Sequence, residues 1–400
     1  MERTYSVCCC GVDVGKSSHH FAEIIPATGE LVFDGKVEQS ESGIRDALLS
    51  VSLFGSPVVV VDQPGNMAAL LFAVCDDMGI AKGFITPRAM SKAIEMHGGD
   101  IKTDAHDALV IAEVSSSLPK LVKPVGEKSA LYLRLSALMS YDRELTLEST
   151  RATNRLHDLL LSVSPALEAH LEGKRVQSNF SLMVLSRYGG PAGLKKAGRG
   201  NVRRWLRSRK GMGEAALRRL DDLFEAIGRQ SVTIAGSEYV EELIKQEASF
   251  LLTVLASRKK VAESRDELLS QMPEARLLMS LPGLGAVTCA TFLAEVGDIS
   301  RFPNASKLAS YAGLAPKVRQ SGKTIHSVTK PRGGNRRLKR VLVLSAGKSV
   351  QFCEESRAYY ERKRSEGHSY GSCMMALARR RLNVMYAMLR DGTAYEKQNG

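Results

Sequence analysis

Short apolar runs separated by turns fill the first 125 residues, the pattern of a mixed α/β domain. Residues 6–14 and 57–62 are nearly continuous apolar runs, as expected for strands buried on both faces. Further strands are expected at 20–25, 31–37 and 82–85, and helices at 42–53, 66–78, 88–97 and 104–115. Thr103 precedes the last helix as an N-cap residue. The order β-β-β-α-β-α-β-α predicts a mixed sheet covered by helices.

A coiled-coil pattern replaces this alternation after residue 126. Between residues 131 and 163 apolar positions recur at spacings of four and three, broken only by Asp142 and Ser149. A second, weaker seam covers residues 240–268. The two seams predict an antiparallel helical arm or a dimerisation surface, and an ordinary helical hairpin within one chain explains them equally well.

The last third is mainly helical and includes a helix-hairpin-helix around Gly283 and Gly285, a layout that can point backbone N–H groups at phosphate. A polar loop at 317–334 contains Ser321 among cations, and a helix with a basic start follows. The cations expected to contact nucleic acid here are Lys317, Arg319, Lys323, Arg336, Arg337, Lys339 and Arg340. The chain is thus divided into an α/β domain (1–125), a helical coiled-coil region with a basic insertion (126–270) and a mainly helical C-terminal domain (271–400).

Charge and composition narrow the function. The net charge of +13 and a pI near 9.4 favour a polyanionic partner, with an anionic membrane surface as the competing explanation. No apolar stretch reaches the roughly 18 residues that span a bilayer, and the first residues lack a secretory signal layout. The seven cysteines show no zinc-ligand spacing, which is typical of a reduced cytoplasmic protein.

Residues 195–210 form a basic window without a single acid. A solvated helix face usually mixes both signs, so this window indicates phosphate contact, with Trp205 a candidate for stacking on a base. The residues assigned to this contact are Lys195, Lys196, Arg199, Arg203, Arg204, Trp205, Arg207, Arg209 and Lys210.

Four aspartates carry the candidate chemistry. Asp13 and Asp62 end predicted strands, while Asp104 and Asp107 are three apart and therefore share one helix face. Each has an ordinary explanation alone: a loop cap, a turn or a helix N-terminus. Together they offer the hard oxygen ligands that two Mg²⁺ ions would need for phosphodiester chemistry.

Ser321 precedes a glycine, and a serine in that setting is usually a turn residue. Its cationic surroundings favour a nucleophile, because positive charge attracts phosphate and stabilises an alkoxide. No His–Asp pair is placed to act as a triad base.

Motifs at both ends of the chain resemble the DEDD domain and the C-terminal domain of insertion-sequence transposases of the one-ten family. The N-terminal motifs are Gly11-Val12-Asp13-Val14-Gly15-Lys16, Val59-Val60-Val61-Asp62 and Lys102-Thr103-Asp104-Ala105-His106-Asp107-Ala108. The C-terminal motifs are Leu281-Pro282-Gly283-Leu284-Gly285, Gly297-Asp298, Arg301-Phe302, Tyr311-Ala312-Gly313-Leu314-Ala315-Pro316 and Ser321-Gly322. They cover about the first and last thirds of the chain, in the family's order.

This resemblance implies a RuvC-like, ribonuclease-H-type domain whose four acids, Asp13, Asp62, Asp104 and Asp107, bind Mg²⁺. It also implies that Ser321 attacks a DNA phosphodiester and forms a covalent phosphoserine. The implied partners are donor and target DNA, a structured bridge RNA that pairs with both, and further copies of the chain, from dimer to tetramer. The implied location is the bacterial cytoplasm, at the nucleoid.

Two departures from the family's pattern concern Asp62 and the middle region. The family commonly has glutamate before Ala-Thr-Gly, whereas Asp62 precedes Gln63-Pro64-Gly65, so its role as a ligand is open. The middle region is longer than in compact members, and the role of its basic insertion (178–235) does not follow by analogy.

Three alternatives remain at this stage. A hydrolytic junction resolvase would use the same acids with water as nucleophile. An actin-like or sugar-kinase-like ATPase would use Asp13-Val14-Gly15 at a phosphate-binding turn, but a second glycine-rich phosphate loop is missing. A non-catalytic RNA-binding protein would not need all four acids.

Overall fold

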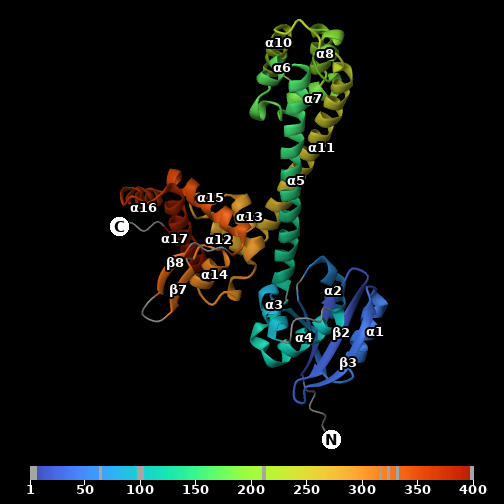
Figure 1. Ribbon diagram of the computed structural model, residues 1–400, viewed down its shortest axis with the longest axis vertical. Coiled ribbons are helices and arrows are strands. Elements are labelled where there is room, and N and C mark those ends of the chain that lie inside the picture. Colours follow the sequence, from blue (N-terminus) through green and yellow to red (C-terminus); the bar gives the residue numbers. More distant parts are fainter. Residues whose placement is uncertain are drawn as a thin grey trace. The chain divides into compact units, whose positions relative to one another are not determined.

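The computed structural model describes residues 7–62, 65–96, 103–125, 127–209, 213–315, 317–321, 325–329 and 333–396. The chain forms two compact units, Met1–Ala130 and Leu131–Gly400 (Figure 1). In the described ranges, no helix has the length and apolar character needed to cross a membrane.

A six-stranded sheet with the order β3-β2-β1-β4-β5-β6 forms the centre of the first unit. Its strands are β1 (Val7–Val14), β2 (Ser18–Ile25), β3 (Glu30–Glu38), β4 (Ser56–Val61), β5 (Ala81–Phe84) and β6 (Lys123–Pro124). The first three strands form an antiparallel meander, whereas β4 runs parallel to β1 and β5 runs parallel to β4. This order and polarity is the ribonuclease-H-type arrangement, so the predicted mixed α/β fold is confirmed.

Helices cover both faces of this sheet. One face packs on α1 (Glu41–Val51) and α2 (Ala69–Asp77) through Val12 and Val61. The other packs on α3 (Pro87–Met96) and α4 (Asp104–Ser117) through Val60. Successive residues of a strand point to opposite faces of the sheet. Val60 therefore belongs to the core beneath α3 and α4, whereas Val12 and Val61 belong to the core beneath α1 and α2. The predicted elements of the first unit agree with these bounds to within a few residues, and among its described residues only the two-residue β6, too short to carry a pattern, was missed.

Two long helices, α5 (Glu127–Val163) and α11 (Ser237–Ser270), run side by side in the second unit (Figure 1). They pack together through Leu156 and Leu251, and Arg155 of α5 lies 2.8 Å from Glu247 of α11. The two predicted seams therefore meet within one chain. Smaller helices join them at one end: α6 (Pro165–His170), α7 (Asn179–Tyr188), α8 (Pro191–Ala197), α9 (Arg199–Arg207) and α10 (Glu214–Gly228).

A separate core unites the C-terminal helices with the start of α5, through Leu135, Phe292 and Leu342. The helices are α12 (Pro273–Met279), α13 (Ala286–Val296), α14 (Ala305–Tyr311), α15 (Arg336–Phe352), α16 (Glu354–Ser365) and α17 (Tyr370–Asp391). The three-part division at 125 and 270 stays a prediction.

The segment expected to be a polar loop contains a hairpin instead. Strands β7 (Lys317–Ser321) and β8 (Ile325–Thr329) pair antiparallel, with Ser321 opposite Ile325. The β-branched residues Val318 and Val328 are opposite each other in the two strands, and such residues favour strands. The loop prediction was wrong because each strand is only five residues long and mostly polar, so it shows no clear alternation of apolar and polar positions.

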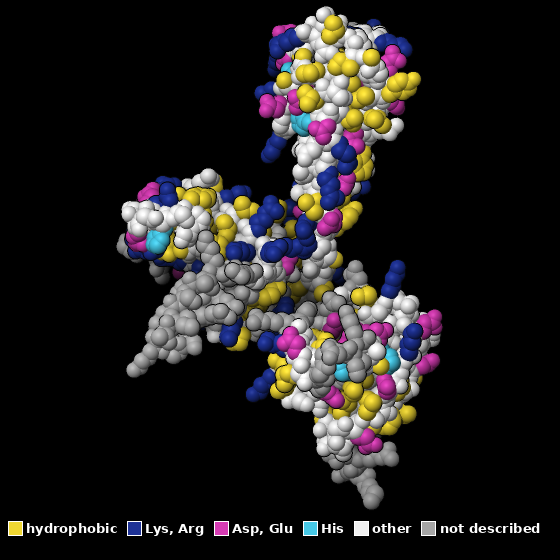
Figure 2. Space-filling view, in the orientation of Figure 1, with side chains coloured by type: hydrophobic (Ala, Val, Ile, Leu, Met, Phe, Trp, Pro, Cys, Tyr) yellow, Lys and Arg dark blue, Asp and Glu magenta, His cyan; other side chains and the backbone are white. Residues whose placement is uncertain are grey.

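The chain's positive charge is unevenly distributed. The first unit has more Asp and Glu than Lys and Arg, so the whole excess of +13 lies in the second unit. Figure 2 shows the same contrast on one face, with Lys and Arg prominent on the second unit and Asp and Glu on the first. The second unit should therefore attract a polyanion. The first unit should repel a polyanion unless bound cations neutralise its acids.

Candidate functional site

The carboxyl ends of β1 and β4 bring two of the predicted acids together. The strands are parallel, with Val12 opposite Val61, so the same register places Asp13 next to Asp62. Since both valines point into the core beneath α1 and α2, Asp13 and Asp62 belong to the opposite face, which packs against α4.

Helix α4 supplies the other two acids from its first turn. The Thr103 hydroxyl accepts a hydrogen bond from the His106 backbone N–H at 3.2 Å and caps the helix. Asp104 and Asp107 follow directly, at positions where the helix dipole stabilises negative charge.

Gly11 allows α4 to lie directly on β1. A Cβ atom at this position would lie 2.3 Å from the carbonyl oxygen of Ala108 and 2.4 Å from the nitrogen of Ala112. Only a residue without a side chain fits there. Because Gly11 is two residues before Asp13 on the same face, this close contact places the first turn of α4 beside the strand ends.

The four carboxylates interact electrostatically. Burial is the largest cause that raises the pKa of Asp13, followed by the charges of Asp104, Asp62 and Asp107, and together they bring it to about 6. The charge of His20 acts in the opposite direction. The structure therefore places the other three acids that the sequence singled out, which come from two further segments, near enough to Asp13 to raise its pKa.

The donor set fits a divalent cation. All four groups are hard carboxylate oxygens, and their mutual repulsion is the penalty that a bound cation removes. Across the described residues, no three His, Cys, Asp or Glu side chains are already close enough together to form a metal-binding group. Carboxylates that repel one another would have to move closer as the ion binds.

Two histidines beside the site have partners that the sequence analysis did not find. His20 lies opposite Asp13 on β2, and its Nε2 atom is 2.6 Å from Asp34 on β3. The buried His19 accepts a hydrogen bond from the backbone N–H of Gly15 at 3.3 Å and so fixes the turn after Asp13. The antiparallel β2–β3 register, which a sequence pattern does not specify, pairs His20 with Lys36 and so makes Asp34 its diagonal neighbour.

Ser321 belongs to the second unit, at the last position of β7. Lys317 and Arg319 lie in the same strand, whereas Lys323 and Lys210 lie outside the described residues. The assignment of Ser321 as nucleophile stays a prediction.

Several residues of the basic window at 195–210 already have partners in the folded chain. Asp221 of α10 lies 2.6 Å from Arg203 and 3.7 Å from Arg199. The Trp205 ring lies 5.0 Å from the guanidinium of Arg187 and 5.4 Å from that of Arg209. A base that stacked on Trp205 would have to displace these cations, since they already occupy the ring. The remaining basic residues that the structure describes, Lys195, Lys196, Arg204 and Arg207, are exposed.

Some of the C-terminal residues that were predicted to contact nucleic acid instead hold the helices of this region together. Arg337 bonds Glu295 and Ser140, both at 3.2 Å, and so ties α15 to α13 and α5. The hairpin at Gly283 (φ +79°) lies against the backbone of α15. Buried Arg381, which the sequence analysis did not single out, donates to the Pro282 carbonyl at 2.7 Å. The other candidates on described residues are exposed or half-buried: Gly285, Arg336, Lys339 and Arg340.

Comparisons with known proteins agree with this architecture. A family model described as Transposase matches residues 10–165, and one described as Transposase IS116/IS110/IS902 family matches residues 275–361. An insertion element IS110 protein of Streptomyces coelicolor is 38% identical over 97% of this chain and 95% of its own length. An insertion element IS116 protein of Streptomyces clavuligerus is 32% identical over 95% of this chain and 94% of its own length.

Among solved structures, T. thermophilus RuvC in complex with a Holliday junction substrate aligns over 30% of this chain and 99% of its own. The identity is 15% and the TM-score 0.25, so the fold assignment depends on the strand order rather than on this likeness. The family matches contain the four acids in one range and Ser321 in the other. The chain belongs to the IS110 family of insertion-sequence transposases, enzymes that act on DNA.

Proposed function

We propose that this transposase is an RNA-guided DNA recombinase that cuts and rejoins DNA through a covalent bond to Ser321, with Mg²⁺ held by Asp13, Asp62, Asp104 and Asp107. The observation that carries the proposal is the gathering of four acids at one end of two parallel strands, where burial and then the charges of the other three acids raise the pKa of Asp13. Folding alone gives no reason for this repulsion, whereas metal-assisted phosphoryl chemistry does.

In the proposed cleavage step, Ser321 Oγ bonds to phosphorus as the bond to the leaving deoxyribose oxygen breaks. The serine proton is lost to water, and the leaving oxygen gains one. Bound Mg²⁺ would lower the pKa of the Ser321 hydroxyl and stabilise the negative charge on the leaving oxygen. Attack by a hydroxyl from another strand would reverse the step, release Ser321 and rejoin the DNA. The acids hold the ion, and the cations of the second unit attract the DNA backbone.

The guide RNA is supported by the family resemblance and by the charge distribution. The second unit carries the whole positive excess of the chain, enough to contact RNA as well as DNA. Sequencing the RNA protected in the purified protein tests this point. One defined small RNA supports guidance, and a random population contradicts it.

Trapping of a protein–DNA adduct tests the nucleophile. The protein with its co-purified RNA, Mg²⁺ and labelled DNA should give a band that survives denaturation, and the modified peptide should contain Ser321. Ser321→Ala should lose the adduct and strand exchange, while Ser327→Ala, a serine of the paired strand β8, serves as the matched control. If Ser321→Ala still cleaves DNA, water is the nucleophile and the enzyme is a hydrolytic resolvase.

Mixing variants tests whether subunits share the site. Asp13→Ala and Ser321→Ala should each be inactive yet folded, as judged by circular dichroism. Partial recovery on mixing is expected if the acids of one subunit work with the serine of another in a dimer or tetramer. Inactivity of every mixture would exclude such sharing.

A further inference from the structure

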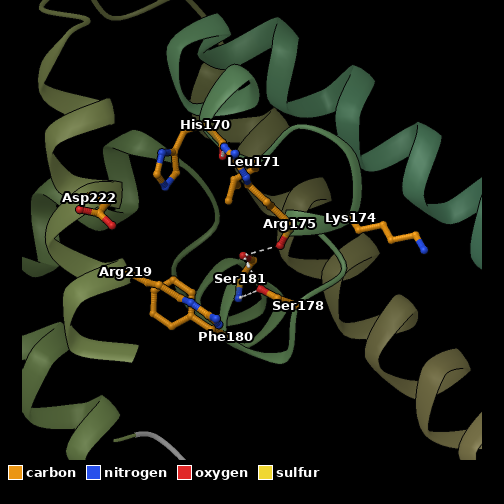
Figure 3. Close-up of a pocket in the computed structure, with 9 residues that line it drawn as sticks. All are labelled: His170, Leu171, Lys174, Arg175, Ser178, Phe180, Ser181, Arg219 and Asp222. Carbon is orange, nitrogen blue, oxygen red and sulfur yellow. Dashed lines mark hydrogen bonds between the residues drawn. The ribbon is translucent and has the colours of Figure 1, made fainter. Parts of the chain in front are cut away.

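A hollow of about 610 Å³ opens among the small helices that join α5 to α11. Figure 3 shows its lining, which comes from the end of α6, the loop before α7, the start of α7, and α10. This size is within the range of about 300–1,000 Å³ typical of ligand sites. The lining residues are His170, Leu171, Lys174, Arg175, Ser178, Phe180, Ser181, Arg219 and Asp222.

The loop that forms one wall is held in place by its own bonds. The Ser181 hydroxyl donates to the Arg175 carbonyl at 2.8 Å, and the Ser178 hydroxyl accepts from the Ser181 N–H at 3.2 Å. Gln177 bonds Thr153 of α5 at 2.9 Å. The Arg175 guanidinium in turn donates to the carbonyl of His170 at 3.3 Å. A wall fixed in this way loses little conformational entropy when a ligand binds.

Cations dominate the lining and are not neutralised. Lys174, Arg175 and Arg219 are exposed, and none of them forms an ion pair with any residue that the structure describes. Figure 3 shows Arg219 beside Phe180 and Arg175 reaching toward His170, with Lys174 extending away at the rim. Unpaired arginines at a fixed hollow are suited to phosphate oxygens.

Other lining groups indicate more than a phosphate. Asp222 would repel a simple anion, but its carboxylate can accept hydrogen bonds from the amino group of a cytosine or adenine. His170, which Figure 3 shows on the same side of the hollow as Asp222, adds a second group able to bond a base edge. Leu171 and Phe180, almost fully buried, supply apolar wall.

We propose that this hollow binds an unpaired nucleotide of a single-stranded nucleic acid, with the phosphate on Arg175 and Arg219 and the base toward Asp222. A base within a duplex is stacked and paired, so it cannot enter without being extruded. This site goes beyond the proposed function, because it lies on the arm and requires neither the acids nor Ser321. The basic window at 195–210 contributes none of its lining.

Binding of fluorescent oligonucleotides to the full chain tests the site. The probes are single-stranded RNA, DNA of the same sequence, and the DNA duplex. Arg219→Ala should weaken single-strand binding about five- to tenfold and reduce the slope of log affinity against log salt by about 0.7. Arg218→Ala removes an exposed cation one position away on α10 that does not line the hollow, and should change affinity less than about twofold. Equal losses for both variants, or equal losses on the duplex, would overturn the proposal. Comparison of the RNA and DNA probes identifies which of the two nucleic acids the hollow prefers.

Asp222→Ala, which removes both the hydrogen-bond acceptor and the negative charge, distinguishes binding of a nucleotide from binding of a phosphate alone. If a base bonds the carboxylate, the variant should lose its preference for oligo(C) and oligo(A) over oligo(U). If only phosphate binds, removing the negative charge should tighten all three probes equally, and the proposal fails. Displacement of oligo(C) from the wild-type protein by poly(Glu) at equal charge concentration would indicate an acidic protein partner and would also overturn it.

Discussion

Replacing Gly11 by alanine tests whether the direct contact of α4 with β1 positions the four aspartates of the proposed metal site. The new Cβ atom would lie 2.3 Å from the Ala108 carbonyl oxygen, whereas real contacts of this kind essentially never fall below 3.0 Å. Both obstructing atoms are helix backbone, so the helix must retreat by roughly 1 Å. Overpacking of this kind costs about 1–3 kcal/mol of unfolding free energy.

The retreat should affect catalysis more than stability. Asp104 and Asp107 move with α4, while Asp13 stays with its strand. A displacement of about 1 Å in a catalytic arrangement can lower the rate about 100-fold. The pKa of Asp13 should fall below its value of about 6, because Asp104, the strongest of the repelling charges, lies farther away.

Three measurements decide the outcome: urea unfolding, the rate of DNA adduct formation, and the Asp13 carboxyl pKa by NMR. Gly35→Ala is the matched control, because its Cβ would meet only the Phe33 ring of β3, at 3.4 Å. A Gly11→Ala protein that forms adducts at the wild-type rate, with the Asp13 pKa unchanged, would refute the reasoning.

Two further predictions concern buried carboxylates. Burial raises the pKa of Glu23 from 4.5 to about 8, and neither of its oxygens has a partner. The folded state therefore holds a proton that the unfolded state releases, and stability falls as pH rises from 4.5 to 8. Glu23→Gln should match wild type in urea unfolding at pH 4.5 and exceed it at pH 8 by roughly 4 kcal/mol; a constant difference would contradict this. Glu241 accepts from the backbone N–H groups of Ala192 and Gly193 at 2.7 and 2.8 Å, so Glu241→Ala should lower the unfolding free energy by about 2 kcal/mol. Exposed Glu242→Ala should cost less than about 0.5 kcal/mol, and equal losses would count against the account.

The sequence alone determined the elements of the first unit apart from the short β6, and it singled out the four candidate acids. Apolar runs such as 57–62 are local signals, because a strand buried on both faces must be apolar at nearly every position. Asp13 and Asp62 were recognisable because each ends such a run, and Asp104 because Thr103 marks a helix start. The basic excess likewise needed no structure to indicate a polyanionic partner.

Only the tertiary structure decided which residues meet. Gly11 is unremarkable in sequence, and its role follows from a helix about 100 residues later that packs on it. The window at 195–210 contains no acid, yet Asp221 reaches it from the next helix. Arg175 and Arg219 lie 44 positions apart and share one hollow. Local pattern encodes the backbone of each element, whereas the pairing of side chains depends on long-range packing that no short window contains.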